Sequence, residues 1–290
     1  MFGCATVNGP AGDGCVWAQG GGETFRRTGD FEHADVDGQL NGRFRAGFER
    51  PLGGDWMIGG ALGYDSLGTL RIDNHRATVD GDGIHGGLGV RHAGAGGAQL
   101  AALVSGGWQW NHNSRAMDIF GPAIGTSDQS SSYAQANAEA AYVLGGTVFA
   151  RPALRGSVTG PRQNGFPERG LAGLGVESLA HIQWIATASP ELTLGVQLSG
   201  TPGAGAVLSV TGGGDFHSTG RIVAPFRLLG ANPAADPALI GTGIDRSGWH
   251  LGAQLPVAGN DRFAVRLNYD RRFGERATSE SFGVDARLKF

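Results

Sequence analysis

The feature that most constrains the fold is an alternation of apolar and polar side chains that recurs along almost the whole chain. In the stretch 36–48, VDGQLNGRFRAGF, the even positions carry Val, Gly, Leu, Gly, Phe, Ala and Phe, whereas the odd positions carry Asp, Gln, Asn, Arg, Arg and Gly. A period of two is the repeat of a β-strand, because successive side chains of a strand point to opposite faces. The sequence therefore predicts ribbons with one apolar face and one polar face.

The alternation predicts an all-β chain of twelve antiparallel strands. No stretch offers three or four helical turns with an apolar stripe, so no helix is expected to cover a sheet face as in a βαβ fold. The eighth strand changes phase near Ser178 and Leu179, which a β-bulge would explain. The expected strands are 14–27, 35–50, 55–66, 79–92, 98–111, 128–144, 147–159, 171–187, 190–200, 245–257, 262–274 and 278–290.

The connections between these strands alternate in length. Short turns are expected at 51–54, 93–97, 145–146, 189–190 and 257–261, and the intervening connections at 67–78, 112–127, 160–170 and 201–244 are mostly long. One end of the structure should therefore carry turns and the other end loops. Because the strand number is even, both termini should lie on the side of the short turns.

Two settings suit so many strands with one polar face. In a soluble sandwich the apolar face packs against a second sheet, whereas in a membrane barrel it meets lipid and the polar face lines a wet lumen. Soluble strands average about five or six residues, but crossing a bilayer at a tilt of about 45° takes about nine to eleven, which these strands reach. Strand length therefore favours the barrel.

Aromatic residues stand at the ends of the apolar faces. Trp56 and Tyr64 share one face of a predicted strand and lie roughly 26 Å apart at a rise of about 3.3 Å per residue. Such a placement is typical of the two interfacial girdles of a barrel, and the alternative is that these are core aromatics of a sandwich. The predicted interfacial aromatics are Trp56, Tyr64, Trp108, Trp110, Tyr142 and Tyr269.

A sheet in lipid has to close on itself, because each unpaired backbone group at an open edge costs several kcal/mol there. The sequence therefore predicts a transmembrane antiparallel β-barrel with a polar lumen. The residues expected to line it have mixed sign with an excess of cations: Asp37, Arg43, Arg45, Glu139, Arg151, Arg155, Arg266, Asp270, Asp285 and Arg287.

Composition argues against several classes of protein. The 290 residues carry a net charge of −3 with 17% charged residues, so the chain lacks the basic field that attracts nucleic acid. It has no run of eighteen apolar residues, and Met1 is not followed by the basic region and apolar core of a signal peptide. Neither a transmembrane helix nor an export signal is expected.

The two cysteines, Cys4 and Cys15, lie within the first fifteen residues. A pair at this spacing predicts a structural disulfide in an oxidising compartment, and it offers too few ligands for a structural zinc site. No cofactor is predicted.

Several short motifs occur in an order and at a spacing that resemble one protein family. They are CVWA at 15–18, GALGYDS at 60–66, NGFPERG at 164–170, GTGID at 241–245, YDRRFG at 269–274 and the terminal Phe290. On these motifs the chain resembles the C-terminal translocator β-barrel of autotransporters, the type V secretion proteins of Gram-negative outer membranes. The resemblance covers nearly the whole chain.

The resemblance implies a twelve-stranded outer-membrane barrel that anchors an N-terminal passenger polypeptide and lets it reach the cell surface. It also implies that the outer-membrane assembly machinery recognises the last strand, which is consistent with capture of an unpaired strand edge before closure. The chain is expected to be a monomer in outer-membrane lipid. The implied assembly signal consists of Phe282, Val284, Ala286, Leu288 and Phe290, for which the alternative is a set of ordinary lipid-facing residues.

The N-terminal region departs from the family pattern. Residues 14–290 are expected to form the barrel domain, and residues 1–13 to be a remnant of the passenger linker, since they are rich in Gly and Pro and show no helical pattern. The helix that plugs family barrels, with its processing site, has no counterpart. We therefore expect the passenger to lie outside this sequence and assign no self-cleaving residues.

Rival functions have weaker support. GDGIHG at 81–86 spells a dinucleotide fingerprint, but strand alternation follows it and no acidic residue occurs from Ile84 to Met117. An outer-membrane hydrolase could be built from His85, His112, His217 or His250, yet no local catalytic motif is present. No enzyme activity is expected. A passive channel for small solutes is the alternative function, because the lumenal charges could also favour anions.

Overall fold

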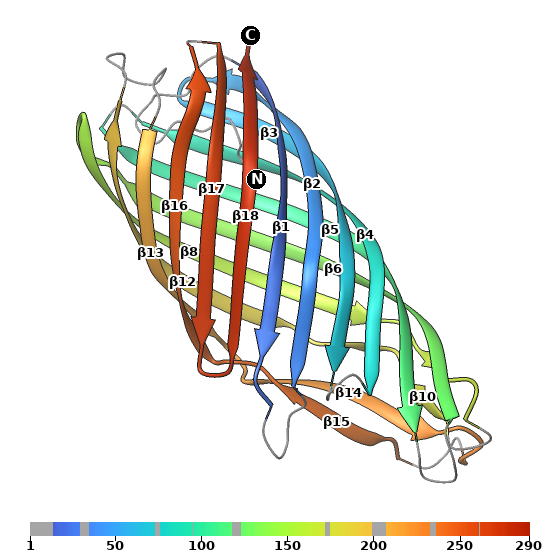
Figure 1. Ribbon diagram of the computed structural model, residues 1–290. Helices are drawn as coiled ribbons and strands as arrows, with labels where there is room; N and C mark the ends of the chain where they lie inside the picture. Colours follow the sequence, from blue (N-terminus) through green and yellow to red (C-terminus); the bar gives the residue numbers. More distant parts are fainter. Residues whose placement is uncertain are drawn as a thin grey trace.

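The structure is a computed structural model, which describes residues 14–29, 35–72, 76–94, 96–117, 123–171, 175–198, 207–232, 236–260 and 262–290. These residues form a tall β-barrel with strongly tilted strands (Figure 1). None of its described segments is a helix of the length and apolarity needed to cross a membrane.

Twelve long strands build the barrel wall within the described residues. They are β1 (Cys15–Arg27), β2 (Val36–Gly53), β3 (Trp56–Ile72), β4 (Ala77–Ala93), β5 (Ala98–Met117), β6 (Ala123–Tyr142), β8 (Val148–Gln163), β12 (Ile185–Gln197), β13 (Val207–His217), β16 (Ser247–Gly259), β17 (Phe263–Gly274) and β18 (Ala277–Lys289). The two-residue strands β7 (Leu144–Gly145) and β11 (His181–Ile182) pair with β8.

Antiparallel pairing closes the ring. The first and last strands, β1 and β18, pair over their whole length from Cys15 opposite Lys289 to Arg27 opposite Ala277. On the far side β6 pairs with β8, so the order of strands around the barrel follows the sequence. The predicted closed, twelve-stranded antiparallel barrel is confirmed.

The strands turn large apolar side chains outward. Leu62 is 75% exposed and Val148 71%, and in the described residues no second sheet covers these faces. A soluble domain would not leave so large an apolar surface to water. Few apolar residues are buried in the described part of the chain, and the core cluster consists of Cys15 and Trp17 against Ala61. Hydrocarbon is therefore the solvent that suits the outer face.

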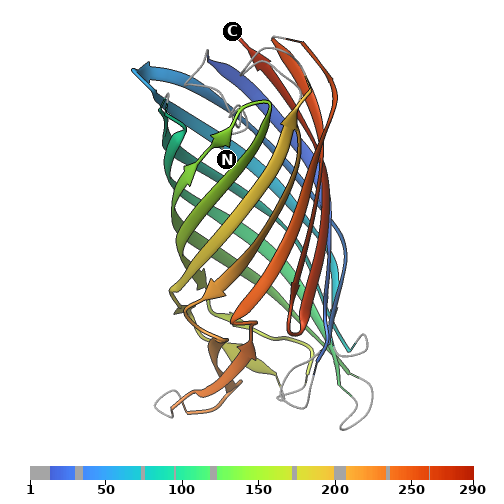
Figure 2. The same cartoon turned by 90° about the vertical axis from the view of Figure 1, so that its left-hand side faces the viewer.

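A small second sheet lies at the end of the barrel that carries the long loops. Its strands, in spatial order, are β15 (Ala238–Gly243), β14 (Arg221–Leu228), β10 (Val176–Ser178) and β9 (Phe166–Pro167). Figures 1 and 2 show it beyond the barrel end opposite to the C-terminus. Arg115 of β5 holds it to the barrel through a bidentate ion pair with Glu168, at 2.9 and 2.6 Å.

Two predicted strands were wrong in position although the count was right. The expected turn at Ser189–Pro190 lies inside β12, where these residues pair with Arg155 and Leu154 of β8. Neither residue has a register partner on β13, so the missing N–H of Pro190 costs no ladder hydrogen bond on that side. The ninth strand is β13, inside the expected 201–244 loop.

The expected eighth strand, 171–187, is not one strand either. Its residues contribute β10 to the small sheet, β11 to the edge of β8 and only the start of β12 to the barrel. The change of phase near Ser178 and Leu179 therefore marks the end of β10 and not a bulge within a strand.

Candidate functional site

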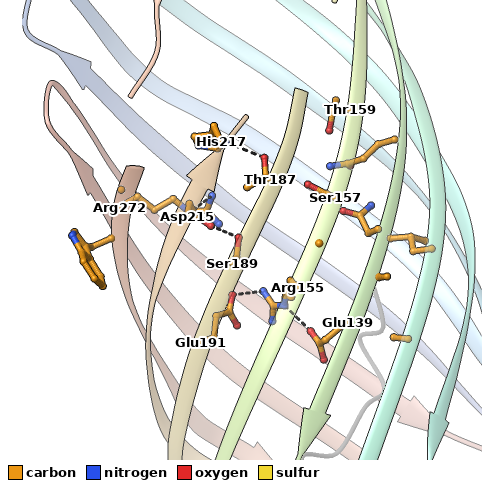
Figure 3. Close-up of a pocket in the computed structure, with 18 of the residues that line it drawn as sticks. Glu139, Arg155, Ser157, Thr159, Thr187, Ser189, Glu191, Asp215, His217 and Arg272 are labelled. Carbon is orange, nitrogen blue, oxygen red and sulfur yellow. Dashed lines mark hydrogen bonds and ion pairs between the residues drawn. The ribbon is translucent and has the colours of Figure 1, made fainter. Parts of the chain in front are cut away.

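The interior of the barrel holds a cavity of about 920 Å³. Its lining includes charged and hydroxyl side chains from β6, β8, β12, β13 and β17. Figure 3 shows these side chains projecting from neighbouring strands into one shared space. They alternate along each strand with exposed apolar residues, which places them on the lumenal face.

Arg155 is the centre of an ion-pair network on this wall. Its Nε donates to Glu139 Oε2 at 2.6 Å, and its Nη1 lies 2.8 Å from Glu191 Oε1 (Figure 3). Arg151 forms a second ion pair with Glu139 and donates from Nε to Gln99 Oε1 at 2.8 Å. Two arginines on β8 thus share one carboxylate on β6.

The network continues across β12, β13 and β16. The ring of His250 lies between two carboxylates, with Nε2 3.4 Å from Glu191 Oε1 and Nδ1 3.6 Å from Asp215 Oδ2. Ser189 Oγ donates to Asp215 Oδ1 at 2.5 Å, and Arg272 Nη1 lies 4.0 Å from the other oxygen of Asp215.

We call this set the paired wall: Glu139, Arg151, Arg155, Glu191, Asp215 and His250. Glu191 and His250 have side chains only 4% and 6% exposed. Buried charges are tolerated when they are paired and hydrogen-bonded, and a network of them holds its side chains rigid. The paired wall is therefore a fixed part of the lumen surface.

The facing part of the lumen, on β17, β18, β1 and β2, is built differently. Arg266 Nη2 lies 3.6 Å from Asp285 Oδ2, and Arg43 Nη1 lies 3.5 Å from Glu23 Oε2. Arg287 is only 7% exposed. We call the interior face of these four strands the seam wall, because β1 and β18 close the barrel there.

Most of the predicted lumenal residues lie on one of these two walls or beside them. The structure places on the face opposite the exposed apolar side chains Arg43, Arg45, Glu139, Arg151, Arg155, Arg266, Asp270, Asp285 and Arg287. Sequence reasoning missed Ser189, Glu191, Asp215 and His250, because the strands that carry the first three were misplaced.

Asp37 is an exception among the predicted lumenal residues. The register between β1 and β2 shifts between Glu23 and Phe25, where β2 contains one residue more than β1. The extra residue reverses the phase of β2, so Asp37 lies opposite Arg26 on the outer face, and both side chains are more than half exposed. The prediction of a lumenal Asp37 was wrong.

The six predicted interfacial aromatics are all on the outer face. Their exposures fall between 43% and 49%. Tyr64, Ile84 and Trp108 are neighbours in register across β3, β4 and β5, so they form one row on the outer face, perpendicular to the strands. The strands β3 and β5 continue well past this row toward the loop end, so an interface at this row would leave their ends outside the bilayer.

The histidines do not form a catalytic triad within the described part of the chain. His85 pairs with Asp65 at 3.0 Å, His112 with Asp128 at 2.9 Å, and His217 with the Thr187 hydroxyl at 2.9 Å. Ser189, Asp215 and His250 do meet, but the serine hydroxyl donates to the carboxylate. A nucleophilic serine would have to donate to the imidazole instead.

Two other predicted features lie at the short-turn end. Cys15 is completely buried and disulfide-bonded, while Cys4 lies outside the described residues. Of the assembly-signal residues, Phe282, Val284, Leu288 and Phe290 are exposed on the outer face, and Ala286 is half-buried. Their recognition by other proteins stays a prediction.

Comparison with known proteins identifies the family. Residues 16–270 match the family model described as autotransporter beta-domain. The chain belongs to the autotransporter β-domain family. The resemblance predicted from the motifs is thereby confirmed.

Solved structures of this family share the fold. The translocator domain of the autotransporter NalP from Neisseria meningitidis is similar with a TM-score of 0.75 at 18% identity, covering 98% of this chain and 91% of that one. The β-domain of the Bordetella autotransporter BrkA is similar with a TM-score of 0.69 at 20% identity, covering 96% of this chain and 100% of that one. The transport unit of the autotransporter AIDA-I from Escherichia coli is similar with a TM-score of 0.60 at 10% identity, covering 95% of this chain and 90% of that one.

No curated protein sequence matches this chain. As a member of the family, the barrel is a bacterial outer-membrane translocator for a passenger polypeptide, and the alternative of a passive channel is not favoured. The family is one of transport barrels and not of enzymes.

Proposed function

We propose that this autotransporter β-domain anchors its passenger in the outer membrane of a Gram-negative bacterium and gives it a hydrated route through the lumen. The observation that carries the proposal is the division of the two faces: exposed apolar side chains outside, and charged side chains around a cavity inside. An extended chain exposes backbone amides, and only a polar lumen can satisfy them during passage.

The route would begin at the short-turn end. Gly14, just before β1, accepts a backbone hydrogen bond from Phe290 N at 2.9 Å, so polypeptide that precedes β1 adjoins the C-terminus. Residues 1–13 would form the remnant of the linker and residues 14–290 the barrel domain. The passenger would then leave at the end that carries the small sheet.

Recognition by the assembly machinery would have to precede closure. In the folded barrel both edges of β18 are occupied, one by β1 and one by β17, so no edge of this strand remains for strand addition. Phe282, Val284, Ala286, Leu288 and Phe290 would be read from the unclosed strand. Because the barrel closes within one chain, no second chain is needed to pair its edge strands, and we propose that it is a monomer. We also propose that it catalyses no reaction.

Surface display of a test passenger examines this function. A signal peptide and an epitope-tagged passenger are fused upstream of Met1, and protease is added to intact cells. We expect cleavage of the passenger while the barrel remains intact and heat-modifiable on a gel. A folded barrel whose passenger stays protected in the periplasm would contradict the proposal.

A further inference from the structure

Arg287 is a buried charge on the seam wall that forms no ion pair within the described residues. The charged residues that interact electrostatically with its guanidinium are Arg266 and Glu49. Glu49 is held by Arg91 at 2.9 Å, and Asp285, on the same face of β18, is held by Arg266 at 3.6 Å. In the described part of the chain no carboxylate oxygen lies within 4 Å of the Arg287 guanidinium, although the residue is only 7% exposed.

Further polar groups without partners in the described residues lie on the same wall. Trp17 is in register with Arg287, and its Nε1 has no hydrogen-bond acceptor among the described residues. Arg45, on β2, likewise has an unpartnered Nε and no ion pair within the described ranges. Arginine and tryptophan side chains have donors but no acceptor, so a ligand that satisfies these groups must supply acceptors.

The same wall also offers acceptors. Asp285 Oδ1 and both amide atoms of Asn268 are buried without hydrogen bonds in the described residues. A simple anion could satisfy the arginines but not these oxygens. A polypeptide with acidic side chains supplies both kinds of group, because its carboxylates accept and its backbone N–H groups donate.

The position of Arg287 in the barrel also favours a polypeptide as the ligand. Arg287 lies three residues from the C-terminal Phe290, whose backbone bonds to Gly14, at the end where the chain preceding β1 meets the barrel. We propose that Arg287 and Arg45 bind a carboxylate-bearing stretch of the passenger polypeptide as it enters the lumen, an inference that rests on the proposed function.

The strand register sets the spacing of this site. Arg287 lies beside Trp17 of β1, and Arg45 lies beside Gln19, two residues further along the same strand and on its other side. With about 4.8 Å between strands and about 3.3 Å per residue, the two arginine Cα atoms are about 12 Å apart. Carboxylates four residues apart in an extended segment, about 13 Å, match this distance.

Peptide binding to the full 290-residue chain, refolded in detergent micelles, tests the site. Three fluorescent twelve-residue peptides of glycine and serine carry, four residues apart, two glutamates, two glutamines or two lysines. We expect the glutamate peptide to bind about tenfold more tightly than the glutamine peptide by fluorescence anisotropy, and the lysine peptide to bind no better than the glutamine one. Equal affinity of the glutamate and glutamine peptides would overturn the proposal.

Variants locate the binding. Arg287→Gln should remove most of the preference for glutamate, and Arg287→Lys should keep part of it. The matched control is Arg271→Gln, which removes an arginine from β17 that pairs with Glu280 at 3.3 Å while more than half exposed. An equal loss in the control would show general attraction only, and an unchanged affinity of Arg287→Gln would place the peptide elsewhere. Displacement of the glutamate peptide by inorganic phosphate at matched ionic strength would indicate an anion site only and would also overturn the proposal.

Folding and function are checked on the same proteins. Heat-modifiability shows whether each variant folds, and Arg287→Lys supplies the second variant if Arg287→Gln does not. If the peptides bind alike but the passenger still reaches the surface of cells, only this inference fails. If the passenger stays inside with a folded wild-type barrel, the proposed function fails whatever the peptides do.

Discussion

The two sides of the lumen differ in how completely their buried charges are paired. On the paired wall, the charges of Glu139, Arg155 and Glu191 meet partners of opposite sign on neighbouring strands. On the seam wall, Arg287 is only 7% exposed and has no such partner in the described structure. The middle of the paired wall, β8, is six strands from β1 in either direction around the ring, so the two walls face each other.

This difference suggests that the two walls have different roles, one in stability and one in binding. A charge that is paired and hydrogen-bonded in the wall contributes to a defined interior, whereas a buried charge without a partner costs several kcal/mol. The fold can tolerate such an unpaired charge when the rest of the structure is stable enough. A ligand that pairs with the charge then removes the cost. We therefore assign to the paired wall the supporting role, and we propose that the seam wall is the half of the lumen that receives the passenger.

The largest effect should come from breaking the paired wall. Glu139→Ala leaves Arg151 and Arg155 without their shared carboxylate, and we expect the free energy of unfolding to fall by about 3–5 kcal/mol. Urea unfolding followed by tryptophan fluorescence measures it. If Glu139→Ala cost no more than Glu280→Ala, which removes a carboxylate from an exposed outer pair, the paired wall would not be a structural network.

A change of opposite sign is expected on the seam wall. Arg287→Met keeps the apolar part of the side chain and removes the uncompensated charge, so the unfolding free energy should rise by about 1–3 kcal/mol. The same urea titration detects the higher midpoint, and Arg287→Lys, which keeps the charge, should not show it. A destabilised Arg287→Met protein would mean that this arginine is paired, and the contrast between the walls would disappear.

A smaller loss is expected from the hydroxyl that supports the paired wall. Ser189→Ala removes the hydrogen bond to Asp215, but Asp215 keeps His250 and Arg272 nearby, so the loss should be about 1 kcal/mol. Surface display should be unchanged, because the serine has no nucleophilic role. A folded Ser189→Ala barrel that no longer displays its passenger would argue for chemistry at this residue.

The smallest effect should lie outside both walls. The ion pair of Arg271 and Glu280 on the outer face is about half exposed on each side. A double-mutant cycle with alanine at both positions should give a coupling energy below about 1 kcal/mol, because exposed pairs gain little in water. A coupling as large as that within the paired wall would show that burial does not distinguish these pairs.

The sequence predicted most of the barrel because face selection is local. In β18 the apolar side chains of Phe282 to Leu288 face lipid while Asp285 and Arg287 face the lumen. This choice follows from the polarity of each side chain, and the period of two needs no knowledge of the neighbouring strand. The same reasoning placed Arg43, Arg155 and Asp285 on the lumenal face. It failed for Asp37, where one extra residue in β2 reversed the phase.

Alternation ends where hydrocarbon ends, which explains the strands that were drawn too short. Beyond Trp110, β5 continues with polar residues from Asn111 to Arg115, and β6 carries a polar run from Thr126 to Ser132. Both faces of these runs are polar, so no period of two marks them. The strand β13 was missed because Gly212 and Gly214 leave its outer face without apolar side chains there, and Gly213 interrupts its polar face.

The sequence by itself determined that the chain forms a closed membrane barrel, because the preference of each side chain for hydrocarbon or water is fixed residue by residue. Tertiary structure alone decided which charges meet. Glu191 reaches His250 through the register of β12, β13 and β16, and register depends on all the hydrogen bonds between strands at once. The same register leaves Arg287, on the opposite wall, without an ion pair among the described residues.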